Sequence, residues 1–451
     1  MGKGLSWIEG SFIKNLQLDI VGFLAILGEG SVTANIQVST LSKLIFLPRL
    51  LPAPQVFLRP SRDTQLERNA GNVTGVFSGN DKDYVHYIGH VVLDAESMPD
   101  YSVRCVQITN NSKGKVKART KGPLSLLAAL GCAESIAILI VSVWNGDGMA
   151  MLAVLLLSFL SSLAGLSNWW KLELPKRRQL RRKPRDKGDV VIRYPNGSFL
   201  VVECDEDVAR QLYFAPENVY YLIESPWVYR LMSLAGTLML MLGIVALGNA
   251  ENVQQIIFAG CYMLLNAGYW IVAAMPASAH WDLSAFEIKK QRLEKYRAKK
   301  AQRKMKEKAR GTFTDLNTGF TWALWKTIVA TKSIDWVKKN DALPETPIWH
   351  KWLNDALEKA QSQGSYEATV EGYDYPVKSF IVPDWDPLQH FYDLLDESKQ
   401  EQAKTAKTTE GKVDIAKSTA VEGTDSPTTQ FEDSDFIPAG PRRAATLKVD
   451  G

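Results

Sequence analysis

Residues 123–169 read PLSLLAALGCAESIAILIVSVW, NGDG and MAMLAVLLLSFLSSLAGLSNW, and this stretch decides the fold. It holds two apolar runs, Pro123–Trp144 and Met149–Trp169, and two further runs follow at Trp227–Leu247 and Val253–Met275. About 20 apolar residues in a helix cross the hydrocarbon core of a bilayer. Helices of soluble bundles carry a polar face, whereas these runs are apolar all round. The pattern therefore predicts four transmembrane helices, paired as two hairpins.

The charged flanks of the runs predict their orientation. The connections at residues 145–148 and 248–252 contain no Lys or Arg, whereas the other flanks are strongly basic. Short loops rich in Lys and Arg stay on the cytoplasmic side of a membrane. We therefore expect a multi-pass membrane protein with both termini and the central loop in the cytoplasm. The two connections on the far side are short, so ligand recognition is expected inside the membrane or in the cytoplasm.

The central loop predicts a small folded unit between the two transmembrane hairpins. In this loop, Pro195–Gly197 separates two apolar runs, and Asn-Gly at such a position is a strong signal for a β-hairpin. A short helix is expected to follow and to end at Phe214, which makes a ββα unit. No fold is predicted for the N-terminal region, residues 1–122.

The segment after the fourth span predicts several helices. Ser284–Glu287 fits a capping box and predicts a helix that reaches Arg310. An aromatic helix is expected at residues 319–339, and further helices are expected to begin at Pro347 and after Asp386. Two interpretations of the aromatic helix stay open, since it could lie in the membrane interface or dock against the soluble part of the chain.

The predicted fold class is an all-α membrane protein with four transmembrane helices as two helical hairpins, a small cytoplasmic ββα loop unit and cytoplasmic C-terminal helices. The C-terminal tail is rich in Lys, Thr, Glu and Ser and is predicted to be disordered. The expected boundaries are 1–122 for the N-terminal region, 123–170 and 227–275 for the hairpins, 171–226 for the loop, 284–397 for the basic and aromatic helices, and 398–451 for the tail.

Polar residues inside the apolar runs form the first candidate site. Glu134 lies near the middle of the first span, where a charged carboxylate costs about 2.5 kcal/mol or more. It is either a proton- or ion-binding group or a neutral side chain whose hydrogen bond fixes helix packing, and we favour the second interpretation. The expected partners are hydroxyls at matching depth in the second span: Ser158, Ser161 and Ser162. Asn266 in the fourth span is expected to bond with Ser233 or Thr237 and to hold the helices together.

A polybasic segment after the fourth span forms the second candidate site. Basic residues just cytoplasmic of a span bind anionic lipid headgroups, with about 1 kcal/mol for each residue near the surface. A solvated helix that only enforces the topology is the equal alternative. The headgroup candidates are Lys289, Lys290, Arg292, Lys295, Arg297, Lys299, Lys300, Arg303 and Lys304.

Signals of catalysis are few. His86 and His90 form an H-x-x-x-H pattern, but the chain has only five histidines, too few for a membrane di-iron enzyme. The four cysteines form neither a disulfide framework nor a zinc pattern. The sequence has no phosphate-binding loop and no nucleophile elbow. We therefore expect no enzymatic activity, no cofactor, no metal and no nucleic-acid partner.

Several segments between about Lys121 and Phe286 carry a family resemblance. These segments are Gly146–Ala150, Ile192–Phe214, Leu265–Trp270 and His280–Ser284. Together they resemble a family of uncharacterised multi-pass membrane proteins of filamentous fungi. The resemblance implies a membrane protein and no particular activity.

The functional hypothesis is a membrane-anchored scaffold or regulator. It would bind cytoplasmic proteins, and anionic lipid headgroups, through its cytoplasmic parts. The alternative is a transporter or channel subunit that uses Glu134. That alternative requires a homo-oligomer, because four helices rarely enclose a pathway alone.

Overall fold

The computed structural model describes residues 29–111, 116–174, 186–295, 314–370 and 372–418. Within them, four helices are long and apolar enough to cross a membrane. Large apolar side chains are exposed on the outer surface of all four, and extended apolar surfaces of this kind are typical of contacts with a membrane or with another protein. The helices are α6 (Pro123–Asn145), α7 (Gly148–Asn168), α9 (Pro226–Gly248) and α10 (Asn252–Ala273).

Short turns join the helices in consecutive pairs, and one carboxylate ties the two turns together. The first turn uses Gly146 at φ 70°, a conformation that glycine adopts readily. Asp147 then accepts hydrogen bonds from the backbone N–H groups of Met149 and Ala150 through Oδ1, which caps α7. Its Oδ2 accepts from the backbone N–H of Glu251 at 2.8 Å. In the bundle, α9 packs mainly along α7, and α10 packs along α6.

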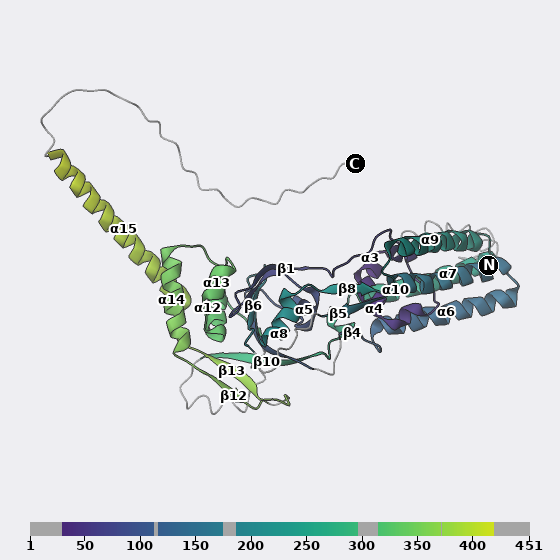
Figure 1. The fold of residues 1–451 in the computed structure, drawn as a ribbon, viewed down its shortest axis with the longest axis horizontal. Coiled ribbons are helices and arrows are strands. Elements are labelled where there is room, and N and C mark those ends of the chain that lie inside the picture. Colours follow the sequence, from purple (N-terminus) through teal and green to yellow (C-terminus); the bar gives the residue numbers. More distant parts are fainter. Residues whose placement is uncertain (1–28, 112–115, 175–185, 296–313, 371, 419–451) are drawn as a thin grey trace, which may run out of the picture. The chain divides into compact units, whose positions relative to one another are not determined.

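The predicted all-α class is wrong, because the chain also forms a nine-stranded mixed sheet. The strands β3 and β7 are parallel and lie at its centre, and β10 runs antiparallel to β3. Figure 1 shows this sheet beside the helical bundle. The strand order is β12 (Ser365–Ala368), β13 (Val377–Val382), β10 (Phe286–Lys295), β3 (Val103–Asn110), β7 (Phe199–Cys204), β6 (Val190–Arg193), β1 (Asn69–Gly75) and β2 (Asp81–Val85), and β11 (Thr314–Asp315) also pairs with β3.

The predicted β-hairpin of the central loop is present as β6 and β7, with Gly197 of its turn at φ 74°. It lies inside the large sheet rather than in a separate small unit. Both of its faces are buried, since Ile192 and Leu200 belong to the main apolar core, and Phe199 packs against Phe320 on the other face. Its runs are therefore almost continuously apolar, as expected for strands covered on two sides. The main core is completed by residues of the short elements α4 (Ile36–Leu41), α5 (Tyr87–Val92), α8 (Glu206–Ala209) and η4 (Arg210–Phe214).

The basic helix predicted from Ser284 is also wrong for residues 286–295, which form strand β10, and the rest of that prediction, to Arg310, lies outside the described residues. Its sequence is rich in good helix formers, but its first half pairs with β3 and its second half with β13. Gln291 donates to Glu203 of β7 at 2.5 Å, and Lys378 of β13 contacts the same carboxylate at 2.8 Å. Tertiary pairing has therefore overridden local propensity.

Two short β-ribbons join the sheet to the bundle. The flank before α6, β4 (Lys117–Ala118), pairs with the flank after α10, β9 (Trp281–Asp282). The flank after α7, β5 (Trp170–Glu173), pairs with the flank before α9, β8 (Asn218–Tyr221). All four helices therefore enter the bundle from the sheet side, and the turns around Gly146 and Asn249 form the opposite end.

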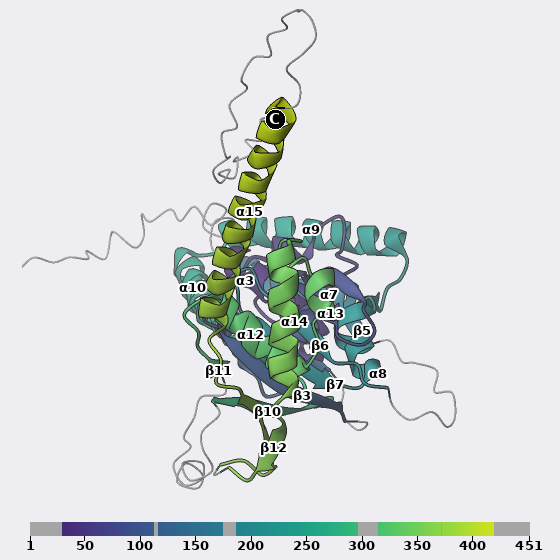
Figure 2. The same ribbon diagram turned by 90° about the vertical axis from the view of Figure 1, so that its left-hand side faces the viewer.

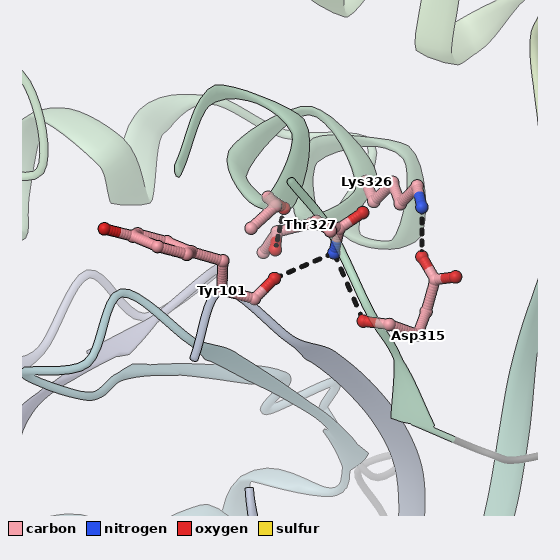
Figure 3. A network of polar contacts seen from close by, with 6 residues as sticks. Tyr101, Asp315, Lys326 and Thr327 are labelled. Atoms are coloured by element: carbon pink, nitrogen blue, oxygen red, sulfur yellow. Dashed lines mark hydrogen bonds and ion pairs between the residues drawn. The ribbon is translucent and has the colours of Figure 1, made fainter. Parts of the chain in front are cut away.

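The aromatic segment docks on the sheet as α12 (Phe320–Thr331) and α13 (Asp335–Lys339). Figure 2 shows both helices and α14 (Pro347–Gln361) over one face of the sheet strands. Lys326 is buried and pairs with Asp315 of β11, and Asn317 donates to the carbonyl oxygens of Asp315 and Tyr101 (Figure 3). Because its apolar residues pack inward, α12 is not available to lie in a membrane interface.

The other short elements follow local signals. Thr346 caps α14 as the Thr-Pro pair predicts, and its hydroxyl accepts from the backbone N–H of Trp349. The helix α15 (Pro387–Ser418) also begins where predicted, but it continues through residues 398–418, where disorder was predicted; the rest of the predicted tail, residues 419–451, lies outside the described residues. From Asp393 the chain belongs to a second compact unit. The remaining elements are α3 (Glu29–Ala34), η1 (Lys43–Phe46), η2 (Pro54–Phe57), η3 (Ala95–Ser97) and η5 (Ala277–Ala279).

The bridge between the two turns gives a first prediction. Replacing Asp147 with Ala removes the cap of α7 and the bond to Glu251, so we expect a lower unfolding temperature in detergent. The loss of a helix cap alone costs about 0.5–2 kcal/mol. The matched control is Glu251→Ala, which removes an exposed carboxylate from the partner turn and keeps the backbone N–H. Equal unfolding temperatures for the two variants would contradict the bridge.

Candidate functional site in the helical bundle

The interior of the bundle is occupied by an N-terminal segment, residues 42–62, which we call the strap. It contains two short 3-10 turns, η1 and η2, and is otherwise extended or irregular. Much of it is deeply buried, including Leu50 at 2% exposure and Ala53 at 0%. Non-helical backbone at membrane depth is tolerated only where protein groups satisfy its N–H and C=O groups. The strap therefore needs hydrogen-bond partners from the surrounding helices.

Hydroxyls near the middle of the bundle supply these partners. The backbone N–H of Arg49 donates to Ser161 Oγ of α7 at 3.0 Å. The N–H of Leu50 donates to Ser135 Oγ of α6 at 2.7 Å. The N–H of Ala53 donates to the phenol oxygen of Tyr262 in α10 at 2.8 Å. Three helices therefore hold the deepest part of the strap.

A second group of side chains binds the carbonyl oxygens of the strap near the sheet side. Asn168 at the end of α7 donates to Phe57 at 2.9 Å. Ser233 of α9 donates to Leu58 at 2.6 Å. Tyr229, one turn earlier in α9, donates to Arg59 at 2.7 Å. With these bonds, every helix of the bundle contributes a side chain to the strap backbone.

Two glycines allow the strap to approach the helices closely. A Cβ atom added at Gly131 of α6 would lie 2.8 Å from the carbonyl oxygen of Leu50. One added at Gly165 of α7 would lie 2.5 Å from the carbonyl oxygen of Ile45. Both distances are far below van der Waals contact, and the obstructing atoms belong to the backbone. Larger residues at these positions would force the strap out of place.

The strap also carries a buried cation that the sequence analysis missed. Arg49 is only 3% exposed, and its Nη1 donates to the carbonyl oxygen of Leu44 at 2.6 Å. Its Cβ atom packs against α6 at Gly131, one helical turn before Glu134. A signal was present in the sequence, since Pro48, Pro52 and Pro54 interrupt an apolar run too short to span a bilayer. Such runs are typical of segments that enter a membrane without crossing it.

The predicted intramembrane residues are placed differently from expectation. Glu134 lies in the middle of α6, is 8% exposed, and neither carboxyl oxygen has a hydrogen-bond partner among the described residues. Ser161 and Ser162 were expected as its partners, but both bind the strap, Ser162 through the carbonyl oxygen of Phe46 at 3.0 Å. The hydroxyl of Ser158 is buried and likewise has no partner in the described part of the chain.

In the fourth span, too, the expected hydrogen-bond partners bind other groups. Asn266 is half-buried in α10, and its expected partners were Ser233 and Thr237. Ser233 instead donates to the strap, and Thr237 donates to the carbonyl oxygen of Ser233 at 2.9 Å. The hydroxyls of Ser233 and Thr237 therefore bind backbone carbonyl oxygens rather than Asn266.

The lipid-headgroup candidates do not form a helical basic face. Lys289 lies on β10, 3.5 Å from Glu287 and over the ring of Tyr375. The backbone N–H of Lys290 donates to the phenol of the same Tyr375, and Arg292 is buried at 8% exposure. Lys295 ends the strand. The candidates Arg297, Lys299, Lys300, Arg303 and Lys304 lie outside the described residues.

The two histidines of the H-x-x-x-H pattern have different surroundings. His86 lies 3.1 Å from the ammonium of Lys82, and burial together with this cation lowers the pKa of His86 to about 4. His90 contacts the phenol of Tyr194 at 3.3 Å, and burial lowers the pKa of His90 as well. The two imidazoles therefore contact different partners, His86 a lysine of β2 and His90 the tyrosine that follows β6.

Comparisons of the chain with protein-family models, curated proteins and solved structures found no match. The resemblance to fungal membrane proteins therefore stays a prediction.

The close contacts at the two glycines give a second prediction. Gly131→Ala and Gly165→Ala place a methyl group against strap backbone, so we expect each to destabilise the protein by about 1–3 kcal/mol, as overpacking does. Gly260→Ala in α10 is the control, since a Cβ atom there meets nothing within 4 Å. Thermal unfolding in detergent measures the difference. If all three variants unfold together, the strap does not occupy the bundle.

Proposed function

We propose that this chain is a membrane-anchored scaffold or regulator whose α/β part, on the cytoplasmic side, binds protein partners. The observation that carries the proposal is the strap, because it fills the interior of the four-helix bundle and uses its hydroxyls as backbone partners. A bundle packed in this way acts as an anchor. The surface left for recognition is then the part of the chain that contains the sheet.

The charge distribution supports the proposed orientation. Among the described residues at the sheet side of the bundle, Lys117, Arg119, Lys121 and Lys171 flank the helices. The turns at the opposite end contain no Lys or Arg. The positive-inside rule therefore favours the sheet in the cytoplasm. Proximity labelling from the sheet-containing part would then identify its cytoplasmic partners.

The orientation gives a third prediction, tested in sealed vesicles whose cytoplasmic face points outward. A cysteine at exposed Glu367 of β12 should react with a membrane-impermeant maleimide before detergent is added. A cysteine at exposed Asn249, in the far turn, should react only after detergent opens the vesicles. The opposite order of reactivity would place the sheet outside the cytoplasm and overturn the proposed orientation.

A second candidate function, an oligomeric transporter or channel subunit, is favoured by one observation. Glu134 has two buried carboxyl oxygens without a partner among the described residues, at the middle of a helix long enough to span a membrane. A buried carboxyl in such a place is a functional candidate by default. Proton or cation movement along the bundle would require the strap to shift, because it occupies the space beside α6.

Flux through reconstituted vesicles separates the two functions and is the fourth prediction. For a scaffold, we expect vesicles with the natural protein to show the same proton and cation flux as empty vesicles, and Glu134→Gln to change nothing. The control Glu251→Gln removes a carboxylate at the far turn instead. Flux that depends on the natural protein and disappears only in Glu134→Gln would reject the scaffold in favour of transport.

A further inference from the structure

A cavity of about 50 Å³ lies where the strap leaves the bundle. Its walls come from α4, from the end of the strap, from the ribbon of β5 and β8, and from the first turn of α9. A buried water needs about 10–15 Å³ of such space, so the cavity holds about four small groups, which is close to the size of one phosphate. Trp170 and Tyr221 of the ribbon line it together with Tyr229 of α9.

The cavity lies at the height of the bilayer headgroups if the four helices span a membrane. Tyr229 is in the first turn of α9, two residues after Trp227, which is 73% exposed. Trp270, near the sheet end of α10, is 70% exposed. Exposed tryptophans at helix ends favour the headgroup layer. The cavity is therefore level with lipid phosphates rather than with lipid tails.

One guanidinium in the cavity wall is held in a fixed position. Arg62 lies between the rings of Tyr221 and Tyr229, at 4.0 and 4.2 Å from the ring centres. Its Nη1 donates to the carbonyl oxygen of Ser167 at 2.9 Å, and its Nη2 donates to that of Ile223 at 2.7 Å. A guanidinium has five N–H donors, so donors remain for an anion. Such preorganisation lowers the entropic cost of binding a ligand.

The charge of the cavity favours an anion with a single negative charge. Three charged side chains line it, the cations Arg59 and Arg62 and the carboxylate Asp63. Two cations against one carboxylate leave one net positive charge. That charge matches a phosphodiester, which carries a single negative charge. Arginine is also suited to phosphate, because its planar fork can donate two parallel hydrogen bonds.

We propose that this cavity binds the phosphodiester of a membrane phospholipid, with Arg59 and Arg62 as its ligands. The lipid source rests on the proposed membrane placement, whereas the phosphate chemistry does not. A bound headgroup would contact α4, the strap and the ribbon of β5 and β8 at once. It would therefore link the lipid composition of the membrane to the position of the sheet.

The test measures the unfolding temperature of the full chain in detergent with three additives. These are phosphatidylglycerol, diacylglycerol with the same acyl chains, and inorganic phosphate. We expect phosphatidylglycerol to raise the unfolding temperature and the other two additives to have little effect. If diacylglycerol is as effective, the phosphate is not recognised and the proposal fails. If inorganic phosphate is as effective, the anion site stands but the lipid source is rejected.

Two variants test the named residues. Arg59 is exposed, and its backbone carbonyl, which accepts hydrogen bonds from Tyr229 and Ser233, is kept in Arg59→Gln, so this variant should fold normally. We expect it to bind phosphatidylglycerol about tenfold more weakly, the effect of one charged hydrogen bond. The control Arg230→Gln removes an exposed cation from the same end of α9, outside the cavity, and should leave binding unchanged. Equal binding by both variants would reject the site without affecting the vesicle-labelling result that tests membrane orientation.

Discussion

Backbone polar groups inside an apolar bundle must find protein partners, and the structure of this chain depends on that constraint. Residues 42–62 place irregular backbone between four helices. Each helix forms a hydrogen bond with this backbone through a hydroxyl, phenol or amide group. An unsatisfied backbone group in hydrocarbon costs several kcal/mol, so these side chains are essential to the packing. The same requirement explains Gly131 and Gly165, since only glycine lets the two backbones come so close.

The strap also makes the bundle and the sheet depend on each other. It begins after α4, whose residues Val38 and Leu41 belong to the main core of the sheet. It ends at Arg62, which donates to the carbonyl oxygens of Ser167 and Ile223, just outside the ribbon of β5 and β8. A shift of the strap would therefore change the packing of both the helical bundle and the sheet. This connection is the physical basis for proposing a regulator rather than a passive anchor.

The parts of the fold that follow from local chemistry could be predicted, and those that depend on distant pairing could not. The turn at Asn196 and Gly197 and the start of α14 at Thr346 and Pro347 depend on interactions within a few residues. Strand β10 is different, because its Lys, Arg, Glu and Gln side chains favour a helix when considered alone. Only β3, far earlier in the chain, and β13, far later, make it a strand. Hydrogen bonds between strands that are distant in the sequence leave no periodic signal in it.

Some features of the candidate site likewise follow from the sequence, and others follow only from the tertiary structure. The sequence by itself determined that Glu134 and the serines lie in long apolar helices, since hydropathy and length act along one segment. Only the tertiary structure decided that Ser161 and Ser162 bind the strap, that Arg49 is buried beside α6, and that Glu134 has no partner among the described residues. The physical reason is that hydrogen-bond partners are chosen by proximity in space. The strap is separated in the sequence by 85 to 209 residues from the side chains of the helices that bind it.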